Sequence, residues 1–321
     1  MTDGSGGAPS GAPRRRFPWA LAAAAAAILA AAPAGAPAAA PCGTVAINEQ
    51  AWAGSVANTY VAKAVLERYL GCTVTITQFG EVPAFQALAD GKTDAVLEDW
   101  QHVAQYRQYV SKEHKAVLGG PNGVVGHIGW YVPSYLMQEH PELRTWKGLK
   151  GHESLVDGTF LGGDPSYVAK DRQLIQQLGL SLTYVGVKSE QAEVARWSAL
   201  YRQRKPALFY WYTPQYLNVE FKLSEVALPP RFAGCVDNFT PGTPVKDYRC
   251  AYANEVLNKV FSAAFARSGS PAYPVLKRFS WSNDDQETVA KWIAGDRMNP
   301  DAAGRKWVAQ NRAKVLRWLG R

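Results

Sequence analysis

Residues 44–77 have the sequence TVAINEQAWAGSVANTYVAKAVLERYLGCTVTIT. Both ends of this stretch are rich in β-branched side chains and predict two strands, 44–48 and 73–77. Between them, apolar residues recur at the spacing of one helix face, which predicts a helix over 55–69. A strand, a helix and a second strand in this order form the βαβ unit of a parallel sheet, so we predict an α/β fold.

The alternation of strands and helices continues after this unit and then restarts further along the chain. The further predicted strands are 94–98, 124–132, 159–162, 182–185 and 207–212, and the further predicted helices are 83–89, 102–110, 166–178, 190–201, 252–266, 275–278, 284–294 and 301–318. Two successive α/β units followed by a helical return predict two lobes with a ligand cleft between them. We expect residues 41–127 plus 226–321 in the first lobe and residues 128–225, inserted, in the second lobe. Segments near 126–132 and 221–226 are expected to cross between the lobes as hinges.

The first forty residues predict an export signal. Arg14, Arg15 and Arg16 precede an almost pure alanine run, 19–32, which is followed by small residues and prolines. A basic region, an apolar region too short to span a bilayer and a small-residue cleavage site are the parts of a secretory signal peptide. We therefore expect residues 1–40 to be removed and the mature chain to lie in the periplasm or on the outer face of the cell membrane. A twin-arginine signal is a second interpretation of the same arginines.

Four cysteines lie in the part expected to be exported, and an even number in an oxidising compartment favours disulfides. Cys42 and Cys72 each precede a predicted strand, and they meet at one sheet edge if those strands are parallel neighbours. Cys235 and Cys250 flank a turn-rich loop. We therefore predict the pairs Cys42–Cys72 and Cys235–Cys250. Acylation of Cys42 as a lipoprotein is an alternative that the preceding proline disfavours.

Composition and motifs argue against several function classes. The formal net charge is +8, but the basic residues of segment 305–321 alternate with apolar ones as on an amphipathic helix, so we expect no nucleic-acid binding. The histidines and cysteines lack the spacing of a metal site, and the sequence has no Gly-x-Ser-x-Gly or His-Glu-x-x-His motif. We therefore expect no cofactor, no metal and no enzyme activity. Two carboxylates that are distant in the sequence and close in the fold can catalyse hydrolysis of a glycosidic bond. An exported hydrolase is therefore the alternative.

Aromatic residues follow three of the predicted strands, where a parallel sheet delivers side chains to a cleft. Trp52 follows the first strand, Trp100 follows the third, and Trp211 with Tyr212 ends the strand 207–212. A quaternary ammonium has no N–H to donate, so proteins pack its methyl groups on aromatic faces, at about 0.5–2 kcal/mol per contact. These positions predict an aromatic cage for such a cation. Burial of each ring in the core is the competing interpretation.

Five segments resemble the glycine betaine/choline substrate-binding protein family of ABC importers. They are 50–55 (QAWAGS), 97–100 (LEDW), 129–134 (GWYVPS), 210–215 (YWYTPQ) and 303–311 (AGRKWVAQN). The resemblance covers about residues 44–318. It implies a two-lobed, type II-like periplasmic-binding fold with the ligand between the lobes, an aromatic cage for the methylated ammonium, and backbone N–H groups and polar side chains for the ligand's carboxylate. It also implies a membrane permease as partner, and we expect the protein to be a monomer.

The resemblance assigns cage positions to Trp52, Trp100 and Tyr212. It puts Gln215 where the family has a histidine that holds the carboxylate, and Gly54 where the choline-binding branch has an acidic residue. We expect replacement anchors at helix starts, whose free N–H groups favour anions. The full set of expected binding residues is Trp52, Gly54, Ser55, Trp100, Tyr131, Asp164, Ser166, Trp211 and Tyr212.

Three polar residues have two interpretations each. Glu98 and Asp99 beside Trp100 either attract a net cation such as choline or cap the helix that follows. His127 either reaches the cleft or forms a hydrogen bond at the hinge. Glycine betaine or a similar solute is therefore the expected ligand, with choline, carnitine or another cation as the alternative.

Overall fold

The computed structural model describes residue 1 and residues 42–167, 169–238 and 246–321. Apart from Met1, the predicted signal peptide lies outside the described residues. Residues 40–321 form one compact unit. Within the described ranges, none of the helices is both long and apolar enough to cross a membrane.

A single mixed sheet contains the nine strands of the described residues. They are β1 (Thr44–Asn48), β2 (Thr73–Thr77), β3 (Ala95–Asp99), β4 (Ala116–Pro133), β5 (Thr159–Leu161), β6 (Thr183–Val185), β7 (Phe209–Thr213), β8 (Leu223–Glu225) and β9 (Asn254–Ser262). The strand order is β2-β1-β3-β9-β4-β7-β5-β6, and β8 pairs with β4 off this path. Strands β2, β1 and β3 are parallel, and so are β6, β5 and β7, whereas β9 and β4 are antiparallel to their neighbours. Two parallel parts are therefore joined by two antiparallel strands, and the predicted βαβ start is confirmed.

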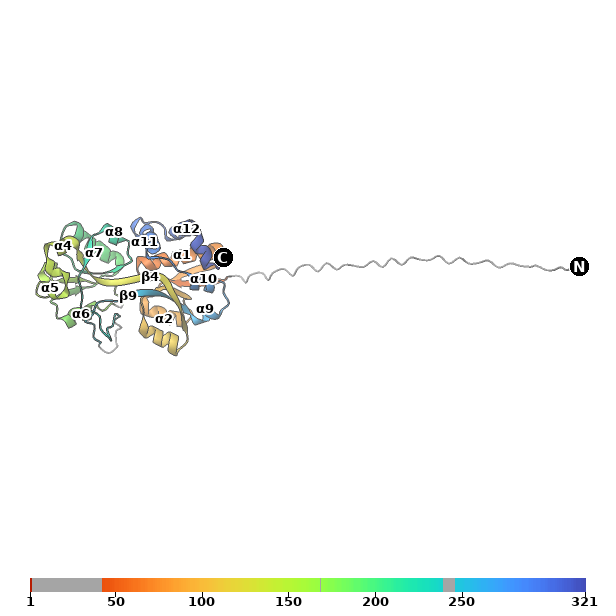
Figure 1. Ribbon diagram of the computed structural model, residues 1–321, viewed down its shortest axis with the longest axis horizontal. Helices are drawn as coiled ribbons and strands as arrows, with labels where there is room; N and C mark the ends of the chain where they lie inside the picture. The colour runs from red at the N-terminus through yellow and green to blue at the C-terminus, as the bar shows by residue number, and fades with distance from the viewer. Residues whose placement is uncertain (2–41, 168, 239–245) are drawn as a thin grey trace. The chain divides into compact units, whose positions relative to one another are not determined.

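Helices surround the two parallel parts and define two lobes. The α-helices are α1 (Ala53–Leu70), α2 (Glu81–Ala89), α3 (Val103–Gln105), α4 (Ser134–Glu139), α5 (Trp146–Leu149), α6 (Asp171–Leu178), α7 (Glu190–Arg202), α8 (Leu217–Glu220), α9 (Ala263–Arg267), α10 (Ala272–Arg278), α11 (Asn283–Ala290), α12 (Pro300–Gln310) and α13 (Arg312–Trp318). Short 3-10 turns at Pro141–Arg144 and Glu153–Val156 and π-helical turns at Tyr106–Lys112 and Lys291–Gly295 complete the helical elements. Figure 1 shows α1, α2 and α9–α12 around one end of the sheet and α4–α8 around the other end. We call these the first lobe and the second lobe.

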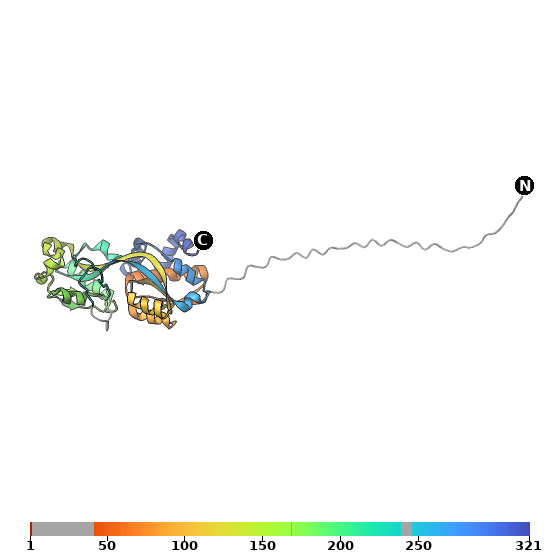
Figure 2. The same ribbon diagram turned by 60° about the horizontal axis from the view of Figure 1, so that its bottom comes forward.

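Strand β4 is 18 residues long and belongs to both lobes. It pairs with β9 between Ala116 and His127, and with β7 between His127 and Tyr131. Figure 2 shows β4 and β9 as the strands that run from one group of helices to the other. The expected crossing at 126–132 therefore lies on β4. Segment 221–226 carries β8, which pairs with the end of β4, so β9 and not this segment is the second crossing strand.

The helix predicted over 252–266 is wrong for most of its length. Asn254–Ser262 is strand β9, and only the following five residues, α9, are helical. Strand β9 has a pairing partner on each edge, β3 and β4, and it fully buries Leu257, Val260 and Phe261. Pairing on both edges and burial outweigh a weak helical spacing, because β-propensity depends mainly on this kind of context.

Residues in 226–238 and in 246–253 form hydrogen bonds with the second lobe. Val226 N donates to Trp130 O at 2.8 Å, and Gln177 Nε2 donates to Lys246 O at 2.9 Å. We therefore propose that the second lobe extends from residue 128 to about residue 253, beyond the limit at 225 that the sequence pattern suggested.

Both predicted disulfides are confirmed. Cys42 and Cys72 are bridged with a Cα–Cα distance of 4.8 Å, and Cys235 and Cys250 with 6.1 Å. Strands β1 and β2 are parallel neighbours, with Thr44 opposite Thr73, so the first pair of cysteines does lie at one sheet edge.

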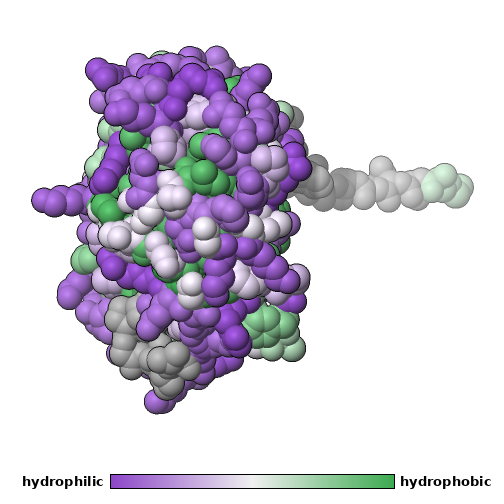
Figure 3. Space-filling model, turned by 90° about the vertical axis from the view of Figure 1, so that its left-hand side faces the viewer, coloured by the Kyte–Doolittle hydropathy of each residue, from purple (hydrophilic) through white to green (hydrophobic). Residues whose placement is uncertain are grey.

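The second lobe keeps its large aromatic side chains inside. Trp197 stacks on Phe209 with ring centroids 4.9 Å apart and meets Trp211 edge to face at 5.0 Å, and all three are fully buried. The outer face of this lobe is mostly hydrophilic and carries hydrophobic side chains only in small separate groups (Figure 3). These rings therefore build the core of the lobe.

Candidate ligand-binding site

A pocket that is partly open to solvent lies where residues that follow β1 and β3 meet residues of β7. Its lining residues are Trp52, Glu81, Trp100, Ile128, Tyr167, Ala169, Tyr210, Tyr212, Asp237, Asn238, Tyr252 and Glu255. Six of these are aromatic and three carry a carboxyl group. Of the described residues that line the cavity, none is a lysine, an arginine or a histidine. The cavity is therefore aromatic and acidic.

Trp52 and Trp100 line the cavity from the first lobe, and a single carboxylate binds both indoles. Glu98 Oε1 accepts the Nε1–H of Trp52 at 2.7 Å and that of Trp100 at 3.1 Å. Its Oε2 accepts the amide of Asn58 at 2.6 Å. Glu98 is 1% exposed, and burial raises its pKa to about 7 although these donors favour the ionised form. A side chain outside the cavity thus fixes the orientation of two cavity rings.

The indole of Trp100 rests on Gly126 of the crossing strand β4. A Cβ placed at position 126 would lie 2.4 Å from a ring carbon of Trp100, so this contact requires glycine. The backbone carbonyl of Trp100 also has a partner, because Asn238 Nδ2 donates to Trp100 O at 3.3 Å. Trp100 is therefore held by the strand that connects the lobes and by the loop that carries Asn238.

Tyrosines form the wall that the second lobe contributes. Tyr212 meets Trp100 edge to face with ring centroids 5.8 Å apart, and Tyr167 meets Trp52 in the same way at 5.6 Å. Tyr210 lies 5.8 Å from Tyr167 and shares one face of β7 with Tyr212, because side chains two residues apart on a strand point the same way. The hydroxyl oxygen of Tyr167 is buried and has no hydrogen-bond partner among the described residues. Rings from both lobes therefore enclose the cavity.

Glu190, the first residue of α7, joins the second lobe to the start of α1. Its Oε2 accepts the backbone N–H of Ala53 at 2.8 Å. Its Oε1 accepts the hydroxyl of Tyr212 and, at 3.0 Å, the amide of Gln215. Glu190 is 3% exposed, and burial raises its pKa although these three donors favour the ionised form. The N–H group at the start of α1 is thus bound by a carboxylate of the chain itself.

Carboxyl groups gather where α2, β3 and β9 meet at the cavity. His102 lies between two of them, with Nδ1 2.7 Å from Asp99 Oδ1 and Nε2 3.1 Å from Glu81 Oε2. Burial lowers the pKa of His102, but these two carboxylates raise it well above the usual value. Asp99 also accepts the His102 N–H at 3.3 Å, so it caps the turn that follows. Burial, and then the charge of Asp237, raise the pKa of Glu255 to about 8.

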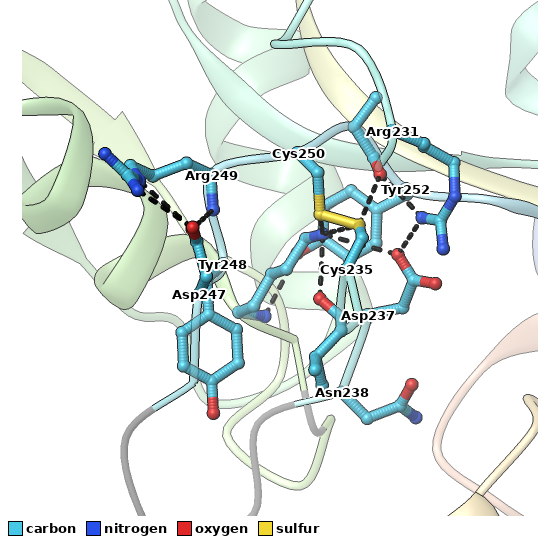
Figure 4. Close-up of polar contacts among 12 residues, drawn as sticks. Arg231, Cys235, Asp237, Asn238, Asp247, Tyr248, Arg249, Cys250 and Tyr252 are labelled. Atoms are coloured by element: carbon cyan, nitrogen blue, oxygen red, sulfur yellow. Dashed lines mark hydrogen bonds and ion pairs between the residues drawn. A yellow bond between two sulfur atoms is a disulfide. The ribbon is translucent and has the colours of Figure 1, made fainter. Parts of the chain in front are cut away.

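The Cys235–Cys250 disulfide holds the loop that brings Asp237 and Asn238 to the cavity. Figure 4 shows Arg231, Asp237 and this disulfide together. Arg231 Nη1 lies 2.6 Å from Asp237 Oδ1, and the buried Lys170 Nζ lies 3.3 Å from the same oxygen. The charge of Asp237 is therefore shared with two cations behind the cavity wall.

Three of the residues expected to bind the ligand line the cavity: Trp52, Trp100 and Tyr212. Gly54 and Ser55 do not, because α1 buries both of them. A Cβ at Gly54 would meet Gln286 at 2.4 Å, and the hydroxyl of Ser55 accepts the Gln50 N–H at 2.9 Å. Among the free N–H groups at the helix start, that of Ala53 is already bound by Glu190.

The other four expected residues also lie outside this cavity. Trp211 belongs to the core of the second lobe, and Tyr131 forms its hydrogen bond with Glu225 on the neighbouring strand β8. Asp164 Oδ1 accepts the Ser166 N–H at 2.8 Å, and both residues line a separate surface depression. The helix expected to begin there begins instead at Asp171.

His127 forms a contact at the hinge. Its Nε2 lies 2.9 Å from Glu225 Oε1, and His127 is not among the residues that line the cavity. Of the two interpretations offered by the sequence, the hinge hydrogen bond is the one that this geometry supports.

Sequence reasoning missed Tyr210, Tyr252, Glu190 and Glu255. Strand period was the available signal for Tyr210, because a strand that directs Tyr212 to the cleft directs Tyr210 there and Trp211 to the opposite face. Glu255 and Tyr252 are not placed at the cavity by a pattern that predicts a helix over 252–266, whereas strand β9 begins at Asn254. Glu190 carries no local signal, because its partners are 137, 22 and 25 residues away in the sequence.

A family model described as the substrate binding domain of ABC-type glycine betaine transport systems matches residues 43–310. The chain belongs to this family. Members are substrate-binding domains of ABC-type glycine betaine transport systems, and this is the role of the chain.

Solved structures of such proteins share the fold. The lactococcal protein OpuAC, in a closed conformation with glycine betaine, is 20% identical, with 86% of this chain and 99% of that chain covered and a TM-score of 0.69. The glycine/betaine/L-proline-binding protein ProX from Borrelia burgdorferi is 22% identical, with 86% and 96% covered and a TM-score of 0.71. An ABC-transporter choline-binding protein in complex with choline is 20% identical, with 87% and 92% covered and a TM-score of 0.70. The two-lobed periplasmic-binding fold is therefore established.

Proposed function

We propose that this protein captures a methylated ammonium ion in the cavity described above and presents it to the membrane permease of an ABC importer. The observation that carries this proposal is the ring of six aromatic side chains around a cavity whose described lining contains no cationic residue. A methylated ammonium offers no N–H, and its charge is attracted to the negative faces of aromatic rings. Several rings around one cation provide affinity and also discriminate against ordinary amines, which lose hydrogen bonds with water when they enter.

Both lobes supply cage rings, which links binding to closure of the lobes. Trp52 and Trp100 come from the first lobe, and Tyr167 and Tyr212 come from the second. A ligand that touches both walls stabilises the closed arrangement by its differential affinity for that state. The permease then recognises the closed protein outside the cytoplasm. Family membership and the two-lobed fold support this partner, and we propose that the binding protein acts as a monomer.

Calorimetric titration of the chain without its predicted signal peptide tests the proposal. The probes are tetramethylammonium, choline and glycine betaine, and ethanolamine serves as the control because it is choline without its three methyl groups. We expect at least one methylated compound to bind and ethanolamine to bind at least about tenfold more weakly than choline. Equal binding of choline and ethanolamine, or no binding of any methylated compound, would refute the aromatic cage as the recognition element.

A further inference from the structure

We infer that the ligand is a net cation, a methylated ammonium without a carboxylate, because the chain itself fills the anion-binding position beside the cage with Glu190 and lines the cavity with further carboxyl groups. This inference rests on the proposed function and narrows it: the cage selects the methylated ammonium, and the polar surroundings select against a zwitterion such as glycine betaine.

The start of α1 is where an anion beside the cage would find backbone donors. A helix start attracts anions through its free N–H groups and its dipole. Here the Ala53 N–H is bound to Glu190 at 2.8 Å, and the same carboxylate takes the Gln215 amide at 3.0 Å and the Tyr212 hydroxyl. All three donors are therefore engaged by an internal carboxylate that is 3% exposed. A ligand carboxylate would have to displace it or approach it as a like charge.

The cavity wall opposes a ligand carboxylate as well. Glu81, Asp237 and Glu255 line the cavity, and Glu98 stands behind Trp52. Lys170 and Arg231 neutralise Asp237, and His102 lies against Glu81. For Glu255, by contrast, the described residues contain no cation within ion-pair distance, although this carboxyl group faces the cavity. A bound cation would supply the counter-charge that Glu255 lacks.

The unpartnered hydroxyl of Tyr167 does not alter this preference. A phenol hydroxyl donates one hydrogen bond or accepts one, so it can pair with an alcohol or with a carboxylate of the ligand. A hydrogen bond from this hydroxyl is open to either ligand, whereas repulsion by the carboxylates of the chain acts only on a ligand that carries a carboxylate itself. Charge therefore decides the ligand class.

Choline and glycine betaine form the test pair, because both carry the same trimethylammonium group and differ in whether an alcohol or a carboxylate follows it. We expect choline to bind at least about tenfold more tightly than glycine betaine in the wild-type protein. Equal binding, or tighter binding of glycine betaine, overturns the inference while leaving the aromatic cage and the proposed function intact. Failure of both compounds and of tetramethylammonium would instead contradict the proposed function itself.

Substitution of Glu190 tests which group sets the preference. Glu190→Gln keeps the shape and removes the charge, and it should shift the ratio of choline affinity to glycine betaine affinity toward glycine betaine by about tenfold. Glu193→Gln is the matched control, since Glu193 lies one turn further along α7, is also buried and forms none of the hydrogen bonds that Glu190 makes with Ala53, Tyr212 and Gln215. An unchanged ratio in Glu190→Gln, or the same shift in the control, overturns the assignment of Glu190.

A second variant covers the case in which Glu190→Gln does not fold, as judged by circular dichroism. Glu255→Gln removes the carboxyl group of the opposite wall, and Glu255 is only half-buried, so its replacement is compatible with the fold. It should weaken the binding of choline and of tetramethylammonium by the same factor, severalfold, because the lost attraction acts on the ammonium charge that both compounds carry. Unchanged choline binding would show that Glu255 does not attract the ammonium charge, and it would refute the inference that acidic residues of the cavity wall select a net cation.

Discussion

The two walls of the cavity are built in different ways. In the first lobe, both indole N–H groups end on Glu98, a carboxylate from the same lobe. In the second lobe, the Tyr212 hydroxyl shares Glu190 with Ala53 of the opposite lobe, and the Tyr167 hydroxyl has no partner among the described residues. The indole N–H groups of the first wall therefore have their acceptor within their own lobe, whereas the Tyr212 hydroxyl of the second wall has an acceptor that also binds the other lobe. This difference predicts which changes affect stability and which affect ligand binding.

The largest expected effect is the removal of the carboxylate that orients the first wall. Glu98→Ala leaves the indole N–H groups of Trp52 and Trp100 and the Asn58 amide without their acceptor. Each unsatisfied buried group costs about 1–3 kcal/mol, so we expect a loss of about 3 kcal/mol or more in the free energy of unfolding. Urea denaturation measures it. Glu67→Ala on α1 removes a partly exposed carboxylate paired with Lys63 and should cost less than about 1 kcal/mol; equal losses would show that Glu98 does not anchor the wall.

Removal of each disulfide in turn distinguishes an effect on stability from an effect on ligand binding. Cys42–Cys72 spans 30 residues and Cys235–Cys250 spans 15, and closing such loops is worth about 3–4 kcal/mol each. Replacing either pair by serines should lower the free energy of unfolding. Only the second replacement should also weaken choline binding, because its loop carries Asp237 and Asn238 to the cavity. Denaturation and calorimetry on both double variants test this, and a binding defect in the first variant would show that the walls are not independent.

A smaller effect is expected from removing one ring of the first wall. Trp100→Ala should weaken choline and tetramethylammonium binding by about tenfold, corresponding to about 1–2 kcal/mol of cation–π interaction. Because Trp100 is only 7% exposed, the variant should also lose stability. Trp211→Ala is the control, since this equally large ring lies in the core of the second lobe and outside the cavity. It should reduce stability without a tenfold change in affinity, and wild-type affinity in Trp100→Ala would exclude Trp100 from the cage.

The smallest expected effect on ligand binding is a dependence on pH, and stability should depend on pH with the opposite sign. Burial raises the pKa of Glu98 to about 7, of Glu255 to about 8 and of Asp171 to about 6. The folded state therefore retains protons that the unfolded state has released, and stability should fall as the pH rises from about 5 to about 8. Thermal unfolding at several pH values measures this trend.

Choline affinity should rise severalfold over the upper part of the same range and level off above pH 8. Its charge is independent of pH, and it favours the ionised form of Glu255, which faces Asp237, Glu81, Asp99 and His102. Binding near pH 7 should therefore release protons, which appears in calorimetry as a binding enthalpy that varies with the ionisation enthalpy of the buffer. Identical enthalpies in all buffers would contradict coupling to Glu255.

Local patterns in the sequence predicted the first wall of the cavity, and the strands that carry it, better than the second wall. The bounds of β1 and β2 were predicted to the residue, because β-branched runs bounded by glycine and turn residues carry their own signal. Trp52 and Trp100 were found because they directly follow strands. Strand β9 was missed because its conformation is imposed by partners on both edges, which lie far away in the sequence.

The candidate site was predicted where it depends on strand ends and missed where it depends on long-range pairing. Trp211 was chosen together with Tyr212, although neighbouring residues on a strand point to opposite faces, so only one of the two could line the cavity. Glu190 could not be found, because its significance arises from a contact with Ala53 in the opposite lobe. The charged groups around the cavity are brought together by contacts between residues that are distant in the sequence. Their spacing along the chain therefore does not predict them.

The contact between Gly126 and Trp100 has a consequence for how this protein can diverge. A side chain at 126 and the indole at 100 compete for the same space, since an added Cβ would lie 2.4 Å from the ring. Neither position is free to change first: a larger residue at 126 collides with tryptophan, and a smaller ring at 100 leaves a void above glycine. Among descendants of this chain, the two positions should therefore be inherited as a pair, and a change of ligand size should appear as a coordinated double replacement on the connecting strand and at the end of β3.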